Sequence, residues 1–261
     1  MISAELSPRQ ATPHPADPSA YVSWKQWTAS GFGSCLAMEA AFFEAELRPL
    51  IGDLACKPKV LELGFGNGQF LGWCKQRDFD YSGVEIDPTM RVRARDAGID
   101  TFDSVFDPAV EISLESFDLV AAFDVIEHIE QAELVAVFAQ IRRLLKTGGF
   151  FIARFPNGDS PFGRVNQHGD MTHVTTLGRG KIFHMAAMTG FSVVSVADPK
   201  RPWSGVGFTN GVRRLLGGIA KKVLETSIRT LYYGGEPVCF DRNCVAVLKK
   251  DAVPQIASPP A

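Results

Sequence analysis

The sequence predicts an α/β fold in which helices cover both faces of a doubly wound, seven-stranded, mostly parallel sheet. The chain has 261 residues, of which 46% are hydrophobic and 21% are charged, so it can bury a full core. From Lys59 onward, short apolar runs alternate with longer amphipathic segments. Runs of this kind are typical of parallel strands that are covered on both faces, and their alternation indicates βαβ units with right-handed crossovers.

Apolar periodicity places each element in order. It predicts helices at 35–51, 71–76, 88–97 and 133–146. Strands are expected at 60–65, 81–86, 99–102, 117–123, 148–155, 191–197 and 243–250. We expect the last two strands to pair as an antiparallel edge, because a long segment separates them.

A single domain is expected over residues 23–250, with a helical lid at 23–56 and a helical insertion at 199–239, before the last strand. Residues 1–22 are polar and Pro-rich, which predicts a flexible arm, and 251–261 are expected to form a flexible tail.

The insertion is strongly basic. Between 200 and 230 there are seven Lys and Arg residues against Glu225 alone, a net charge of +6, and apolar residues recur there at helical spacing. Gly217 and Gly218 each weaken a helix by about 1 kcal/mol relative to alanine, so a hinged or broken helix is predicted. The basic residues form either a solvated face or a contact with an anionic acceptor, such as a lipid-linked or acidic sugar, or with a membrane surface.

Composition excludes several classes of protein. The formal charge of -2 and the pI near 6.2 argue against bulk nucleic-acid binding. Five cysteines without a CxxC pair suggest neither a disulfide framework nor a zinc knuckle. The first residues show no secretion signal, and no apolar run is long enough to cross a bilayer. We therefore expect a cytoplasmic protein, with peripheral contact to the inner membrane through 200–230 as the alternative.

The most informative stretch is the loop Glu62-Leu-Gly-Phe-Gly-Asn-Gly68. It places Gly64, Gly66 and Gly68 between a strand and a helix, where backbone N–H groups can approach a small, partly anionic ligand closely. Glu85 ends the next strand, 17 residues after Gly68, where a carboxylate can accept both hydroxyl hydrogens of a ribose. A nucleotide-containing cofactor is therefore expected.

The loop departs from the dinucleotide fingerprint, because the third glycine comes one residue early and Gln69 holds its place. NAD binding is thus disfavoured. Glu62, two residues before the first glycine, can attract an ammonium group or organise the loop around a cationic cofactor.

These features together resemble the class I S-adenosylmethionine-dependent methyltransferases over about residues 57–250. The loop, Glu85, the FDLVAAFDVIEHI block at 117–129 and LLKTGGFFI at 144–152 carry the resemblance. It implies a Rossmann-like methyltransferase fold that binds S-adenosylmethionine. It assigns to the cofactor the residues Glu62, Gly64, Gly66, Gly68, Glu85, Asp103 and Asp124, with Asp103 or a neighbouring amide near the adenine and Asp124 beside the methionine portion.

A second resemblance concerns the acceptor. Residues 156–162, PNGDSPF, and 169–173, GDMTH, look like a segment of methyltransferases from bacterial polysaccharide and O-antigen pathways. It implies methyl transfer to a sugar hydroxyl of a surface-polysaccharide or lipopolysaccharide precursor. His173 is the candidate base, because a neutral imidazole can take the hydroxyl proton; Asp170 would orient it, and His168 is the reserve.

Other interpretations remain open. The spacing of His168, Asp170 and His173 is also compatible with a metal, but no second group of ligands is evident, so no metal is expected. Glu127 and His128 are as consistent with a structural role at a helix start as with a functional one. Among the rival functions are methyl transfer to a small lipid or quinone, which the FDVIEHI block also resembles, and a noncatalytic, membrane-associated binding protein.

Trp24 and Trp27 precede the first strand. They belong either to the core or to a lid over the cofactor, as in related proteins of the superfamily.

Overall fold

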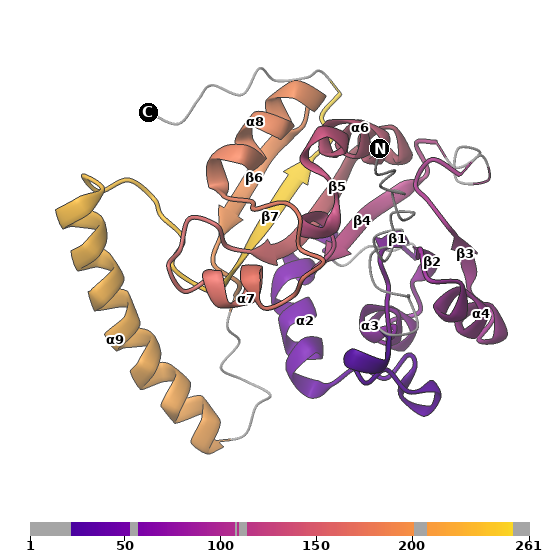
Figure 1. Ribbon diagram of the computed structural model, residues 1–261, viewed down its shortest axis with the longest axis horizontal. Coiled ribbons are helices and arrows are strands. Elements are labelled where there is room, and N and C mark those ends of the chain that lie inside the picture. Colours follow the sequence, from indigo (N-terminus) through magenta and orange to yellow (C-terminus); the bar gives the residue numbers. More distant parts are fainter. Residues whose placement is uncertain (1–21, 53–56, 108, 110–113, 201–207, 253–261) are drawn as a thin grey trace, which may run out of the picture.

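The computed structural model describes residues 22–52, 57–107, 109, 114–200 and 208–252, and it has the predicted seven-stranded sheet (Figure 1). The strands are β1 Lys59–Leu63, β2 Asp80–Val84, β3 Asp100–Phe102, β4 Phe117–Phe123, β5 Leu145–Pro156, β6 Ser192–Ala197 and β7 Asn243–Lys249. The helices are η1 Ala29–Gly31, α2 Ala37–Ile51, α3 Gln69–Gln76, α4 Pro88–Asp96, η2 Ile126–His128, α6 Gln131–Leu144, α7 Arg164–His168, α8 Arg179–Thr189 and α9 Phe208–Tyr232.

The strand order is β3-β2-β1-β4-β5-β7-β6, and the first five of these strands are parallel. β7 pairs antiparallel with both β5 and β6, so the predicted pairing of the last two strands is confirmed. It is β6, however, that forms the edge, since β7 lies between β5 and β6. The carboxyl ends of β1 to β5 meet at one edge, which is where open α/β sheets bind ligands.

Two buried clusters show why the sheet is doubly wound. Leu119 and Ala121 of β4 pack with α2, α3 and α4, whereas Val120 and Ala122 pack with α6 and α8. Successive side chains of a strand point to opposite faces, so a run without polar residues fits only a strand with helices on both sides. The apolar run 119–123 of β4 thus accounts for both helical layers.

The insertion before β7 differs from the sequence prediction. α9 is one continuous helix over Phe208–Tyr232, without a hinge at Gly217 and Gly218. Two glycines weaken a 25-residue helix but leave its backbone hydrogen bonds in place. Lys221, between Asp198, Glu225 and Asp241, also ties the helix to the body of the domain.

In the part of the chain that the structure describes, no helix combines the length and the apolar character needed to cross a membrane. The predicted arm at 1–22 and tail at 251–261 lie almost entirely outside the described residues.

Candidate cofactor site and the adjoining polar cluster

The loop between β1 and α3 is shaped by its glycines. Gly64 and Gly66 have φ values of 63° and 48°, in the left-handed region that disfavours other residues. A Cβ atom at Gly64 would lie 2.5 Å from the side chain of Val125, and one at Gly66 would lie 2.7 Å from the ring of Trp27. Gly68, also left-handed, caps the start of α3. The loop therefore requires glycine for backbone conformation and for space.

Glu85 ties this loop to the end of β2. Its Oε2 accepts a hydrogen bond from the Gly66 N–H at 2.9 Å, and its Oε1 accepts one from the Asp87 N–H at 3.0 Å. Burial raises the pKa of this carboxyl, while the backbone donors oppose that shift. The carboxylate is thus buried, partnered and fixed in direction at the strand end.

Glu62 is a second buried acid beneath the same loop. The Tyr81 hydroxyl donates a hydrogen bond to its Oε2 at 2.5 Å. Burial raises the pKa of Glu62 to about 8, although the Tyr81 hydrogen bond favours the ionised form and opposes the shift. A cationic ligand above the loop would favour the charged carboxylate.

The N-terminal segment covers the glycine loop. The Trp27 ring lies against Gly66, the Gly33 N–H donates to the Asn67 carbonyl at 2.9 Å, and Asn67 Nδ2 donates to the Gly31 carbonyl at 3.2 Å. This placement supports the lid interpretation for Trp27. Trp24 lies on the surface, with 57% of it exposed.

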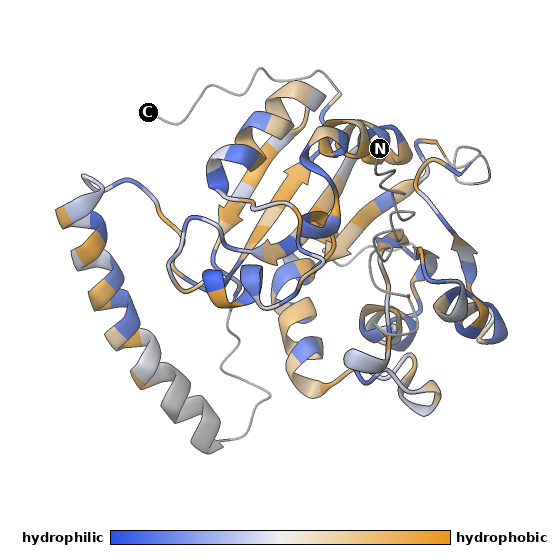
Figure 2. Cartoon of the chain, in the orientation of Figure 1, coloured by the Kyte–Doolittle hydropathy of each residue, from blue (hydrophilic) through white to orange (hydrophobic). Residues whose placement is uncertain are grey.

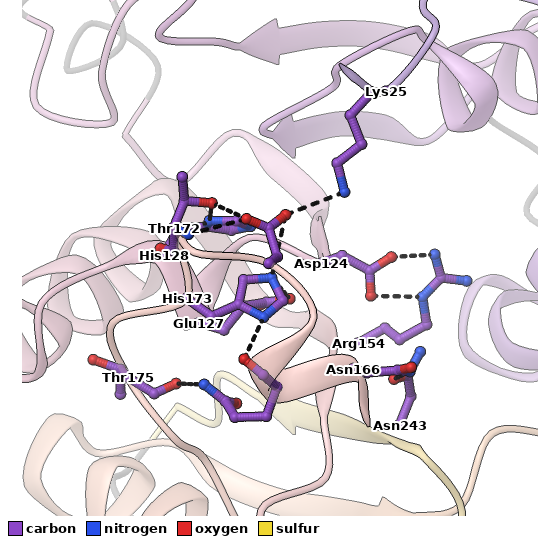
Figure 3. Close-up of polar contacts among 12 residues, drawn as sticks. Lys25, Asp124, Glu127, His128, Arg154, Asn166, Thr172, His173, Thr175 and Asn243 are labelled. Atoms are coloured by element: carbon purple, nitrogen blue, oxygen red, sulfur yellow. Dashed lines mark hydrogen bonds and ion pairs between the residues drawn. The ribbon is translucent and has the colours of Figure 1, made fainter. Parts of the chain in front are cut away.

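A polar cluster forms where η2 meets the segment that follows α7 (Figure 3). The N–H groups of Val174 and Thr175 both donate to the Glu127 carbonyl at 3.0 Å, and Thr175 Oγ1 donates to the Ile129 carbonyl at 2.6 Å. These bonds place His173 beside Glu127, although 46 residues separate the two in the sequence.

The His173 ring is oriented by backbone and carboxylate groups. Its Nδ1 lies 3.2 Å from the Gln167 carbonyl, and its Nε2 lies 3.8 Å from Glu127 Oε1 and 3.8 Å from Asp170 Oδ2. A carbonyl oxygen only accepts hydrogen bonds, so Nδ1 carries the proton and Nε2 of the neutral ring has a lone pair.

Asp170 joins the cluster to the N-terminal segment. Its Oδ1 accepts hydrogen bonds from Thr172 Oγ1 at 2.6 Å and from the Thr172 N–H at 3.0 Å, and Lys25 Nζ lies 3.3 Å from its Oδ2. Burial would raise the pKa of Asp170, but the Thr172 hydrogen bonds and the Lys25 charge outweigh it and lower the pKa to about 2. Asp170 is therefore a carboxylate at neutral pH.

Residues 61–153, which span the glycine loop, Glu85 and η2, match the family model described as a methyltransferase domain. This part of the chain is similar to a methyltransferase domain. S-adenosylmethionine is the cofactor of such domains, and the glycine cradle with two buried carboxylates beside it fits a cationic nucleoside.

Solved structures support the same fold. A SAM-dependent methyltransferase from Archaeoglobus fulgidus is 19% identical, with a TM-score of 0.56 over 81% of this chain and 94% of that one. An S-adenosylmethionine-dependent methyltransferase from Mesorhizobium loti is 16% identical, with a TM-score of 0.52 over 85% and 100%.

A geranyl diphosphate methyltransferase, solved with geranyl diphosphate and sinefungin, is 15% identical, with a TM-score of 0.53 over 81% of this chain and 77% of that one. No curated protein matches the chain significantly. At these identities the structures show the fold of the methyltransferase domain and leave its acceptor open.

The remaining predicted residues lie at the same edge of the sheet or near it. Asp124, with a left-handed φ of 57°, forms a two-point ion pair with Arg154, at 3.1 Å to Nε and 2.5 Å to Nη2. Asp103 follows β3 and is exposed, and His168, at the end of α7, is also exposed. Their predicted roles, like the ribose contact of Glu85, stay predictions.

Part of the segment that resembles polysaccharide methyltransferases has a packing role. Asn157 Nδ2 donates to the carbonyls of Cys239 and Asp241 at 3.0 and 3.1 Å, and Ser160 Oγ donates to the Phe240 carbonyl at 2.8 Å. Both side chains are buried. They hold the segment against the residues before β7, so they offer no side chain to an acceptor.

The sequence left the roles of Glu127 and His128 undecided between structural and functional. Burial, and then the charge of Asp124, raises the pKa of Glu127 well above its usual range, whereas burial and then His173 lower the pKa of His128. The motif Glu-His after β4 was visible, but nothing in the sequence placed it against His173. The expectation of no metal rested on the lack of further ligands, and the structure brings Glu127, His128 and His173 together.

Proposed function

We propose that this methyltransferase domain transfers the methyl group of S-adenosylmethionine to a hydroxyl oxygen of a sugar in a surface-polysaccharide or lipopolysaccharide precursor. Methyl transfer to oxygen is supported above all by the orientation of the His173 ring. Its Nε2 lone pair faces Glu127 and Asp170, at the edge of the sheet where the cofactor loop lies. The sugar acceptor is supported by the GDMTH sequence, of which Asp170, Thr172 and His173 belong to the polar cluster.

Each part of the chain has a task in this reaction. Glu62, Gly64, Gly66, Gly68 and Glu85 would hold the cofactor, which supplies an electrophilic methyl group when bound. The N-terminal segment excludes water from the loop, because Trp27 lies over Gly66. His173 Nε2 takes the hydroxyl proton, and the alignment of acceptor and cofactor contributes more than this base, which adds about 10²–10⁴-fold.

Incubation with labelled S-adenosylmethionine and separate glycan and lipid extracts tests the proposal. We expect label in the glycan fraction, and mass spectrometry should find a 14-dalton gain per acceptor, the mass of one CH₂ unit. Label in the lipid fraction alone would replace the sugar by a small lipid or quinone. No label with any acceptor would favour a noncatalytic binding protein.

Contact with an anionic membrane surface is a second proposal, which α9 supports. Apart from the contacts of Lys221, this helix lies away from the sheet in Figure 1, and the coloured part of it in Figure 2 shows apolar and polar residues on different sides. Leu216, Ile219 and Val223 are 56–63% exposed, and Lys222 is exposed beside them. An exposed apolar stripe flanked by cations is typical of helices that lie in a membrane interface.

Flotation with vesicles that contain anionic lipid tests this contact. The triple variant L216E/I219E/V223E should lose flotation, because it places charge on the apolar stripe. Vesicles of neutral lipid should recover less of the native protein. Equal flotation of the variant and the native protein would contradict a role for α9.

A further inference from the structure

Glu127 is a buried carboxylate without a hydrogen-bond donor. Glu127 is 0% exposed, and among the described residues neither its Oε1 nor its Oε2 has a hydrogen-bond partner. Its backbone is held in this buried position by the Val174 and Thr175 N–H groups, which both donate to the Glu127 carbonyl. A carboxylate in this position is costly unless a cation or a proton compensates it.

Two imidazole rings lie in the same cluster as this carboxylate, with their centroids 4.6 Å apart and their planes at 77° to each other. Nδ1 of His173 lies 3.2 Å from the Gln167 carbonyl, and Nδ1 of His128 lies 3.2 Å from the Thr172 carbonyl. Thr172 Oγ1 donates to Asp170, so it accepts from His128 Nδ1 at 2.9 Å. Both rings therefore carry their proton on Nδ1, which is the arrangement in which Nε2 ligates a metal and a carbonyl holds the ring in place.

One ligand atom from each of Glu127, His128 and His173 lies within 4.8 Å of the other two. Tetrahedral ligands about 2.0–2.2 Å from a Zn²⁺ ion are roughly 3.3–3.6 Å apart, so the three side chains must draw together by about 1 Å to hold the ion. Two imidazoles and one carboxylate suit Zn²⁺ and related ions rather than Mg²⁺ or Ca²⁺, which prefer oxygen. Three protein ligands also leave a coordination position open.

We propose that Glu127, His128 and His173 bind a divalent transition-metal ion, with Zn²⁺ as the best match. A single ion would neutralise the Glu127 carboxylate and use the Nε2 atoms of both rings. His173 does not satisfy the Glu127 carboxylate directly, since its Nε2 is 3.8 Å from Glu127 Oε1 and equally far from Asp170 Oδ2, beyond hydrogen-bond distance of either.

The chemical role of the ion rests on the proposed function. An ion in this position lowers the pKa of an acceptor hydroxyl that binds in its open position. In the loaded protein His173 would hold the ion instead of receiving the proton. The proton then leaves to solvent, the S–CH₃ bond breaks with its electron pair returning to sulfur, and the O–CH₃ bond forms.

Calorimetric titration of the chelator-treated full chain with ZnCl₂, in the absence of cofactor and acceptor, tests the site. We expect one Zn²⁺ per chain, and a loss of affinity of at least about 100-fold for each of Glu127→Gln, His128→Ala and His173→Ala. His184→Ala is the matched control, because His184 is exposed on α8, outside the cluster, and should bind as the native chain does.

Co²⁺ spectra identify the ligands, and circular dichroism checks that each variant is folded. Visible bands of a nitrogen- and oxygen-ligated Co²⁺ should appear in the native chain and in His184→Ala, and disappear in Glu127→Gln. A thiolate charge-transfer band would mean that cysteines bind the ion, and would overturn the proposal. Native-like Zn²⁺ affinity of folded His128→Ala, or no Zn²⁺ binding by the native chain, would overturn it as well.

Measurements of Zn²⁺ binding and of methyl transfer distinguish an error in the proposed metal site from an error in the proposed function. Zn²⁺ binding at the three residues without methyl transfer to any hydroxyl would refute the function and leave the site standing. Methyl transfer that persists in a chain that binds no Zn²⁺ would refute the site and leave the function standing.

Discussion

Glu85, at the end of β2, and Glu127, just after β4, are both buried at the same edge of the sheet, but their surroundings differ. Two backbone N–H groups donate to Glu85, whereas in the described structure no group donates to the Glu127 carboxylate. The carboxylate of the cofactor loop is thus satisfied by the chain itself. The Glu127 carboxylate of the polar cluster instead requires a cation or a proton, which the described part of the chain does not supply.

A binding region and a reactive region can thus share one edge of the same fold. A site that must hold one ligand in one orientation gains from a rigid, fully bonded frame. A site that must exchange protons or bind an ion needs polar atoms with unused capacity, at a cost in stability. Substitutions in the cofactor loop should therefore change the affinity for the cofactor, whereas substitutions in the polar cluster should change turnover or ion binding.

Replacement of His173 by alanine should have the largest effect. We expect turnover to fall about 10²–10⁴-fold, because the group at the acceptor hydroxyl is lost. The dissociation constant of S-adenosylmethionine should stay within about twofold of native, since none of the cofactor-loop hydrogen bonds involves His173. Steady-state kinetics and calorimetry measure the two quantities, and full activity of the variant would remove His173 from the reaction.

The reverse pattern is expected for Glu85→Ala. The N–H groups of Gly66 and Asp87 lose their acceptor, and the loop loses its tie to β2. Two such losses amount to about 3 kcal/mol, or roughly 100-fold in cofactor affinity. Glu127→Gln is the comparison variant, and its cofactor affinity should equal that of the native chain. A similar loss in both variants would show that the two regions are not separate.

A smaller effect concerns pH and Glu62. Its pKa is about 8 in the folded chain, above the ordinary value of 4.5 for a glutamate, so between these pH values the folded state holds a proton that the unfolded state lacks. This group therefore lowers stability as pH rises from about 4.5 to about 8, by at most about 1.4 kcal/mol per pH unit.

Urea unfolding at pH 5 and at pH 8 measures this dependence. The native chain should lose more stability over this interval than Glu62→Gln does, because the amide does not titrate. Parallel losses in the two proteins would show that Glu62 is not the group responsible.

The smallest effect compares two glycines. Gly66→Ala should destabilise the fold by about 1–2 kcal/mol, because φ at 66 is 48° and the new Cβ would meet the Trp27 ring. Gly217→Ala should instead stabilise the protein by up to about 1 kcal/mol, since α9 is helical there and nothing lies within 4 Å of the new atom. Thermal unfolding measures both, and equal signs would contradict this reading of the two sites.

Local sequence patterns predicted much of this molecule. Apolar runs such as that at 119–123 specify strands covered on both faces, and the Gly64, Gly66 and Gly68 spacing specified the loop. These features depend on neighbours within a few residues, so a linear pattern records them. The hinge at Gly217 and Gly218 was predicted wrongly because glycine propensity is a weak preference that a long helix with a tertiary anchor at Lys221 overcomes.

By itself the sequence determined the fold class, the cofactor loop and the choice of His173 and Asp170 as reactive candidates. Only the tertiary structure decided what surrounds them. Backbone hydrogen bonds from residues 174 and 175 to residue 127 bring Glu127 and His128 to His173, and the buried carboxylate there is left without a donor. Contacts between segments more than 40 residues apart depend on how the strands cross over, and no local periodicity encodes that.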